Sequence, residues 1–261
     1  MKKMPVLFVG HGNPMNALDK NSPFNQNFLQ TTQTFEKPKA ILMISAHWYS
    51  SRLQVTSGEN PPMIYDFHGF PEELSQVQYP AKGSPELAEK VRSLLAPESV
   101  EMNPTRGFDH GAWTVLKYLY PDADVPVVQL SINRLQPAEW HFALAKKLAP
   151  LRDEGVLIIG SGNIVHNLRA ISWEHINQIG AGYDWAFAFR NEINQAIDAQ
   201  NDDLLVHYGQ LGENAELAVP TPDHYLPLLY VMALREPSDK VAFFNDELMA
   251  GSLSMTSVLV G

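Results

Sequence analysis

The stretch Ile41-Leu42-Met43-Ile44-Ser45-Ala46-His47-Trp48 decides the predicted fold. Its four consecutive apolar residues, two of them β-branched, predict a strand that is buried on both faces, as in a parallel sheet covered by helices. Small residues stop the apolar run, so we expect the strand to end at His47. Open α/β sheets bind ligands at the carboxyl ends of their strands, which places His47 where a site is expected.

Two other stretches repeat this pattern. Residues 6–10 form an apolar run that leads to His11, and residues 156–160 lead through a Ser-Gly-Asn turn to His166. Carboxyl ends of parallel strands meet at one edge of a sheet, so the three histidines are expected to converge there. Each of them alone could equally be a turn residue, a helix-start residue or a hydrogen-bonded core histidine. Their combination is what indicates a site.

The rest of the chain alternates strands with helices, which predicts an α/β fold with a mostly parallel central sheet flanked by helices and an active site at the carboxyl ends of the strands. We find neither a repeat nor a linker and predict a single domain over residues 1–261. Residues 57–83 lack clear periodicity and are expected to form one wall of a pocket. Helices are expected at 23–35, 86–95, 113–119, 137–148, 183–199 and 225–234, and strands at 6–10, 41–47, 53–56, 125–132, 156–160 and 252–260.

The composition excludes several classes of function. A formal charge of −10 without a cluster of Lys or Arg argues against binding to nucleic acid and to anionic membrane surfaces. Cysteine is absent, so a metal would have to be held by histidine and carboxylate groups. Residues 1–5 lack the pattern of a signal peptide, and no apolar run approaches the roughly 20 residues that span a bilayer. We therefore expect a cytoplasmic protein.

The nine histidines fall into two groups. His141, His175 and His207 have polar or helical neighbours and are predicted to lie at the surface, and His68 lies in the long irregular stretch. Five others occur in loops or at strand ends, and neutral imidazole in such rigid positions suits zinc or iron. Dinucleotide, nucleophile-elbow, P-loop and His-Glu-x-x-His motifs are not present in the sequence. The five are His11, His47, His110, His166 and His224.

The motifs around these five histidines carry a family resemblance. Together and in this order, they resemble the LigB-type extradiol ring-cleavage dioxygenases, and within them the 4,5-DOPA extradiol dioxygenase branch. The resemblance covers nearly the whole chain, and five ordered motifs are far more specific than any one of them. The motifs are Gly10-His11-Gly12-Asn13-Pro14-Met15, Ser45-Ala46-His47-Trp48, Gly107-Phe108-Asp109-His110-Gly111-Ala112-Trp113, Ser161-Gly162-Asn163-Ile164-Val165-His166-Asn167 and Pro222-Asp223-His224-Tyr225-Leu226-Pro227.

The resemblance implies a role for each residue of the site. The metal ligands would be His11, His47 and His224, with His166 as either a fourth ligand or the acid/base group. His110 would flank the substrate and take part in catalysis, and Trp48 and Asn13 would also contact the substrate. The wider LigB pattern has a glutamate as its third ligand, and His224 stands in that position here.

The resemblance also implies the reaction. A catechol, most specifically L-DOPA at its 4,5 bond, would be opened with O₂ at one divalent metal ion. Fe²⁺ is expected for activity because zinc cannot pass electron density to O₂, although an all-histidine site suits Zn²⁺ equally well. We expect the protein to bind neither nucleic acid nor a membrane. A monomer or a small homo-oligomer is expected.

Two alternatives stay open at this point. One is a zinc-dependent hydrolase that uses a zinc-bound water. The other is a non-catalytic metal-binding relative of the same fold, because fold alone does not fix function. Five histidines favour an enzyme, since a binding module would not need both ligands and acid/base groups.

Overall fold

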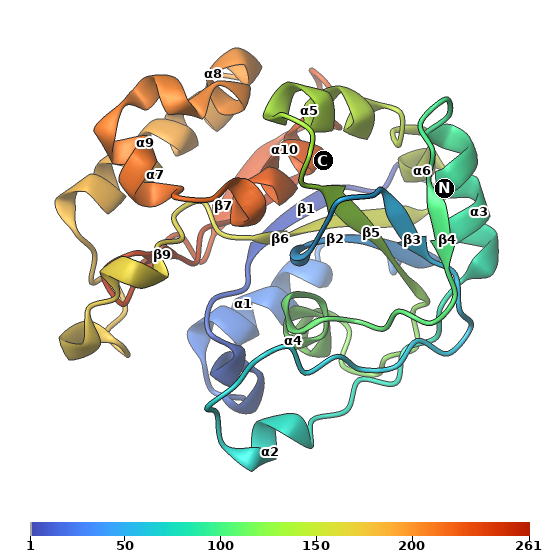
Figure 1. Cartoon of the computed structure of the whole chain (residues 1–261), viewed down its shortest axis with the longest axis horizontal. Helices are drawn as coiled ribbons and strands as arrows, with labels where there is room; N and C mark the ends of the chain where they lie inside the picture. The colour runs from blue at the N-terminus through green and yellow to red at the C-terminus, as the bar shows by residue number, and fades with distance from the viewer. Residues whose placement is uncertain (1) are drawn as a thin grey trace.

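The computed structural model describes residues 2–261. Ten strands are found within this range. They are β1 Val6–Gly10, β2 Ala40–Ser50, β3 Gln54–Thr56, β4 Glu101–Asn103, β5 Val127–Asn133, β6 Val156–Gly162, β7 Val241–Phe244, β8 Leu248–Met249, β9 Leu253–Ser254 and β10 Ser257–Val260. Eight of them form one sheet in the order β4-β3-β5-β2-β6-β1-β10-β7, and β8 and β9 pair separately (Figure 1).

The centre of the large sheet is parallel. Strands β5, β2, β6 and β1 are parallel neighbours, and β3 is parallel to β4. Antiparallel pairs occur between β3 and β5 and at the opposite edge, where β10 pairs with β1 and β7 pairs with β10. The predicted mostly parallel α/β sheet is thereby confirmed.

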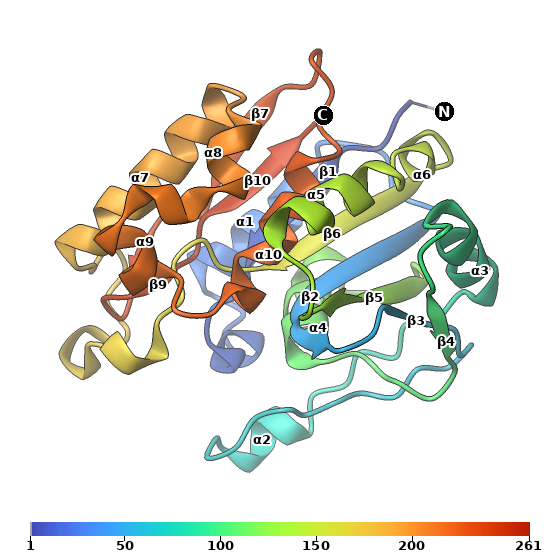
Figure 2. The ribbon, with the colours of Figure 1, turned by 45° about the horizontal axis from the view of Figure 1, so that its top comes forward.

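Helices cover both faces of the sheet. The α-helices are α1 Pro23–Thr32, α2 Glu72–Ser75, α3 Pro85–Leu94, α4 His110–Leu119, α5 Ala138–Lys146, α6 Pro150–Asp153, α7 Asp184–Asp198, α8 Asp202–Val206, α9 Glu213–Ala218 and α10 Leu226–Met232. Short 3₁₀ helices are η1 Pro14–Leu18, η2 Leu168–Ala170, η3 Trp173–His175, η4 Tyr208–Leu211 and η5 Pro222–His224. Helices α5 and α10 lie on one face and α1 and α4 on the other, with α7, α8 and α9 grouped beside α10 (Figure 2).

The alternation of side chains along β2 explains its continuous apolar sequence. Leu42 and Ile44 belong to the core under α5 and α10, whereas Ile41 and Met43 belong to the core under α4. All four side chains are fully buried. Successive residues of a strand point to opposite faces, so a strand between two helical layers needs apolar residues at every position.

The end of β2 differs from the expectation. The strand continues to Ser50, so His47 lies within it and not at its end. Pairing with β6 stops at Ser45, and pairing with β5 is irregular between Ile44 and Tyr49. His47 therefore lies where β2 projects beyond β6, next to an irregularity of the kind that redirects side chains beside active sites.

Two further expectations need correction, and one is confirmed. The strand predicted over 252–260 is interrupted: β9 ends at Ser254, β10 begins at Ser257, and the Ser254 hydroxyl donates to the hydroxyl of Thr256 in the gap. The long irregular stretch contains the short helix α2, and its residues 66–70 line a cavity, as expected of a pocket wall. His141 was predicted to lie at the surface, but it is fully buried and bonds to the hydroxyl of Tyr230.

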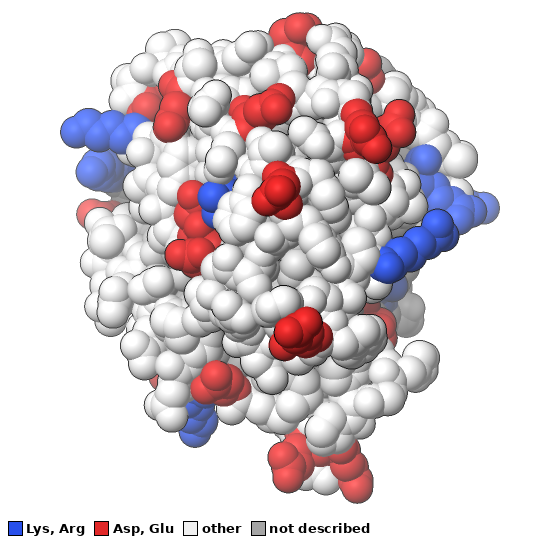
Figure 3. Space-filling model, turned by 90° about the vertical axis from the view of Figure 1, so that its left-hand side faces the viewer, with Lys and Arg blue, Asp and Glu red and all other residues white. Residues whose placement is uncertain are grey.

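Acidic side chains outnumber basic ones in the sequence, 29 to 19. The face that carries α7, α8 and α9 shows separated acidic side chains and few basic ones (Figure 3). Among residues 2–261, no helix combines the length and apolar character that crossing a bilayer requires. The cytoplasmic location stays a prediction.

Candidate active site

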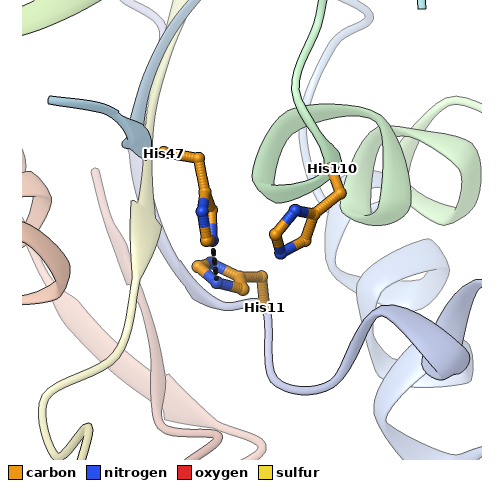
Figure 4. A group of neighbouring side chains, drawn as sticks. All are labelled: His11, His47 and His110. Atoms are coloured by element: carbon orange, nitrogen blue, oxygen red, sulfur yellow. Dashed lines mark hydrogen bonds between the residues drawn. The ribbon is translucent and has the colours of Figure 1, made fainter. Parts of the chain in front are cut away.

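His11, which follows β1, and His47, near the end of β2, face each other. Their Nε2 atoms are 3.1 Å apart (Figure 4). His11 Nδ1 lies 3.1 Å from the Ser161 hydroxyl, which donates its own hydrogen to the carbonyl of Gly111. A hydroxyl has one hydrogen to donate, so Ser161 accepts from His11 Nδ1–H, and the Nε2 lone pair is directed toward His47.

Asp66 lies beside the imidazoles of both His110 and His47. Its Oδ1 lies 3.0 Å from Nδ1 of His110 and also accepts the backbone N–H of that residue at 2.9 Å. Its Oδ2 lies 3.7 Å from Nδ1 of His47. Burial raises the pKa of the Asp66 carboxyl, but the hydrogen bonds and charge of His110 outweigh it and lower the pKa to about 2. Asp66 is therefore ionised and faces Nδ1 of both rings.

His110 is positioned by a helix start. Asp109 caps α4 by accepting the backbone N–H of Ala112, and His110 is the first residue of the helix. The centroids of the His47 and His110 rings are 3.8 Å apart (Figure 4). Capping thus fixes the histidine at the end of a rigid element, as a ligand or an acid/base group requires.

His224 enters the site from η5. Its Nδ1 is bonded to the carboxylate of the preceding Asp223, and its backbone carbonyl accepts the N–H of Asn163 at 2.9 Å. A Cβ at Gly162 would collide with this carbonyl, so glycine is needed there for η5 to approach the end of β6. The buried Nε2 of His224 has no hydrogen-bond partner within residues 2–261. It is available as a ligand atom.

His166 lies directly against His224. The two ring centroids are 3.4 Å apart and the ring planes differ by 4°. Burial, together with the neighbouring His224, lowers the pKa of His166 to about 3. The imidazole is consequently neutral at neutral pH.

The nitrogen atoms of this cluster fit a divalent metal ion. One ligand nitrogen from each of His11, His47 and His110 lies within 4.8 Å of the other two. Burial, reinforced by the neighbouring histidines, lowers the pKa values of His11 and His47 well below the usual range. Metal sites usually contain neutral imidazoles of this kind. The Nε2 lone pair points to the metal, and Nδ1 is hydrogen-bonded to a carboxylate or hydroxyl group. The cluster of three contains His110, whereas the sequence expectation names His224.

All five histidines line one cavity of about 650 Å³. Asn13 and His68 also line it. Among the described residues that line the cavity, Trp48 is not found: its buried ring lies under the guanidinium of Arg106, 4.5 Å from the ring centroid. Contact between Trp48 and a substrate in this cavity would therefore require the ring to move.

The sequence as a whole matches known proteins. Residues 6–225 match the family model described as the catalytic LigB subunit of aromatic ring-opening dioxygenase. A protein of Escherichia coli named 4,5-DOPA dioxygenase extradiol is 44% identical over 99% of this chain and 95% of its own length. The chain belongs to the LigB family.

Two more similarities extend this assignment. A protein of Beta vulgaris with the name 4,5-DOPA dioxygenase extradiol is 38% identical over 97% of this LigB chain and 94% of its own. The crystal structure of an uncharacterized protein of Escherichia coli superposes with a TM-score of 0.86 at 41% identity and covers 99% of this chain and 100% of that one. This LigB protein is thus an extradiol dioxygenase, and the non-catalytic alternative is set aside.

Three residues of this LigB site were missed in the sequence. Asp223 could have been noticed, because a carboxylate directly before a candidate ligand is a common partner of its Nδ1. Ser161 was quoted only as part of a turn. Asp66 gave no signal, because it lies in the stretch without periodicity and reaches the histidines only through the fold.

Proposed function

We propose that this enzyme opens the ring of a catechol by extradiol cleavage with O₂ at one divalent metal ion. L-DOPA, at its 4,5 bond, is the first candidate substrate, because the relatives carry that name. The observation that supports the reaction best is the convergence of five histidines, most with Nδ1 held by a second residue, on one cavity of about 650 Å³. A cavity of this volume accommodates a single substituted aromatic ring.

The proposed metal ligands are His11, His47 and His224. His11 and His47 belong both to the compact nitrogen cluster and to the set implied by the family motifs. For His224 the support is its buried Nε2, which is without a partner among residues 2–261, and the carboxylate on its Nδ1. His110 is the competing third ligand, since one of its ring nitrogens lies within 4.8 Å of the ligand nitrogens of the first two.

Fe²⁺ in this position would bind the catechol oxygens and supply electron density to O₂, whereas Zn²⁺ would occupy the same imidazoles without redox chemistry. His166 lines the cavity beside the proposed ligand His224 and is proposed to take a phenolic proton from the catechol. His110 is proposed to donate a hydrogen bond or a proton to the substrate, and the Asp66 carboxylate would stabilise its imidazolium form. Asn13 lines the same cavity and is proposed to contact the substrate.

The experiment is anaerobic reconstitution with Fe²⁺ or Zn²⁺, followed by air and a catechol. The Fe²⁺ form is expected to consume O₂ without added reductant and to give a coloured ring-opened product. The Zn²⁺ form is expected to bind the catechol and consume no O₂. Hydrolysis of esters without O₂ uptake by either form would favour the zinc hydrolase instead.

We also propose that residues 1–261 form a single domain. The support is that β1 and β10, from opposite ends of the chain, are paired neighbours in the large sheet. Such pairing cannot form unless both ends of the chain fold together. A single cooperative unfolding transition of the metal-free protein is expected, and light scattering would give the oligomeric state.

A further inference from the structure

The outer part of the active-site cavity is apolar. Two segments carry it: residues 67–70, which precede α2, and residues 168–176, which contain η2 and η3. Leu168 is 63% exposed and Trp173 is 79% exposed, although both line the cavity. Phe67, Phe70, Ile171 and Ile176 complete this apolar rim, and the exposed His68 lies beside Phe67 in the lining. Large exposed apolar side chains around a cavity usually mark a surface that a ligand covers.

The same cavity offers no fixed cation. Among the described residues that line it, none is Lys or Arg. Arg169 lies between the lining residues Leu168 and Ile171, but it is exposed and is not part of the lining. The one carboxylate of the lining, Asp66, is already engaged by His110 and His47. A substrate carboxylate would therefore find no Lys or Arg here, only polar side chains such as Asn13 and His68, and a substrate ammonium group would have to compete with two imidazoles for Asp66.

These two features select substrates by their substituent. A carboxylate placed on the rim either loses hydration without compensation or stays in water and contributes no affinity. An alkyl or aromatic substituent gains affinity by covering Trp173, Leu168 and their neighbours. From this, and resting on the proposed catechol cleavage, we infer that the outer cavity recognises an uncharged apolar substituent on the ring, so that the enzyme prefers apolar-substituted catechols to the zwitterionic L-DOPA.

Four compounds test this inference. Catechol, 4-propylcatechol, 3-(3,4-dihydroxyphenyl)propanoate and L-DOPA differ only in the substituent, and the last three share a three-carbon chain. 4-Propylcatechol is expected to have the highest kcat/KM, about tenfold or more above the propanoate and L-DOPA. The difference is expected to come from a lower KM and not from a higher kcat. A factor of ten corresponds to roughly 60 Å² of apolar surface buried at the usual coefficient. An equal or higher kcat/KM for L-DOPA overturns the inference.

Variants assign the preference to the rim. Trp173→Ala is expected to raise KM for 4-propylcatechol about tenfold and to reduce its advantage over catechol, with kcat little changed. Leu135→Ala is the control, because Leu135 is 69% exposed and does not line the cavity within the described residues. It is expected to leave all four compounds unaffected. A selective loss of L-DOPA turnover in Arg169→Ala would show that a cation does bind the carboxylate, and would contradict the inference.

Binding separates this inference from the proposed function. Calorimetric titration of the Zn²⁺-loaded protein with the same four compounds reports affinity without any reaction with O₂. If no catechol, including the unsubstituted one, causes O₂ uptake by the Fe²⁺ form, the proposed reaction is wrong, and the order of the dissociation constants still decides the inference. A tighter complex with L-DOPA or the propanoate than with 4-propylcatechol would refute it.

Discussion

The imidazole rings of His166 and His224 are stacked, with centroids 3.4 Å apart and planes that differ by 4°. This contact joins a proposed ligand to a proposed proton acceptor. Parallel stacked rings direct their edges to the same region, so both residues can reach a molecule bound beside the metal position. Two stacked imidazolium ions would repel each other strongly, which agrees with the low pKa of His166.

The first prediction separates the two roles of His166. In His166→Gln, the metal content and catechol binding are expected to persist, while turnover falls by about 10²–10⁴, the usual contribution of a positioned proton-transfer group. A metal titration and single-turnover kinetics on the same variant measure both quantities. Loss of metal affinity together with activity would make His166 a ligand. Normal turnover with normal metal content would exclude both roles.

The second prediction concerns the third ligand. His11→Ala, His47→Ala and His224→Ala are each expected to abolish stoichiometric metal binding, because each removes one of three proposed ligand nitrogens. His110→Ala is expected to keep the metal and lose activity. Elemental analysis of the four folded variants gives the answer. If His110→Ala loses the metal and His224→Ala retains it, the compact cluster of His11, His47 and His110 is the ligand set.

The third prediction concerns Asp66. Asp66→Asn keeps the shape of the side chain but removes the charge that holds Nδ1 of His110 and His47. Metal affinity or activity is expected to fall by about 10–100-fold, as is usual when a partner of a ligating histidine is replaced. Glu72→Gln is a suitable control, since it removes a carboxylate from the nearby helix α2 that does not line the cavity among the described residues. Equal affinity and activity in Asp66→Asn and the control would show that Asp66 does not orient the rings.

The fourth prediction concerns stability and pH. Burial lowers the pKa of His141 from its ordinary 6.5 to about 4, although its bonds to the backbone partly oppose this. The unfolded chain therefore binds a proton first, and the contribution of His141 is complete above pH 6.5 and is lost as the pH falls from 6.5 to 4. Between pH 7.5 and 5 the loss is about 2 kcal/mol.

Urea unfolding of the metal-free protein tests this prediction. His141→Gln keeps a donor and an acceptor near the Tyr230 hydroxyl and the Asn133 carbonyl, but it cannot titrate. The unfolding free energy of the variant is expected to decrease less on acidification than that of the natural chain. Because the other buried histidines titrate in both proteins, the difference between the two slopes belongs to His141. Identical slopes would contradict the prediction.

The sequence by itself determined the sheet and the edge at which the site lies. Continuous apolar runs before His11, at 41–44 and before His166 predicted strands that are covered on both faces. In the structure these strands are parallel neighbours. The five histidines could be chosen because glycine, proline and strand ends mark fixed positions in the local sequence. Even the position of Trp48 outside the cavity was in principle readable, since neighbouring residues of a strand point to opposite faces.

Tertiary structure alone decided which groups meet. Asp66 comes from an aperiodic stretch, and His166 stacks on a residue far away in the sequence. His141 is buried because Tyr230, 89 residues later, supplies a partner that its own helix does not reveal. The choice between His110 and His224 depends on distances between elements that are separated along the chain. Burial and turn geometry can be predicted from local sequence, because they restrict which residue type each position and its neighbours can have. Contacts between distant segments depend on how the helices and strands pack, and no local pattern encodes that.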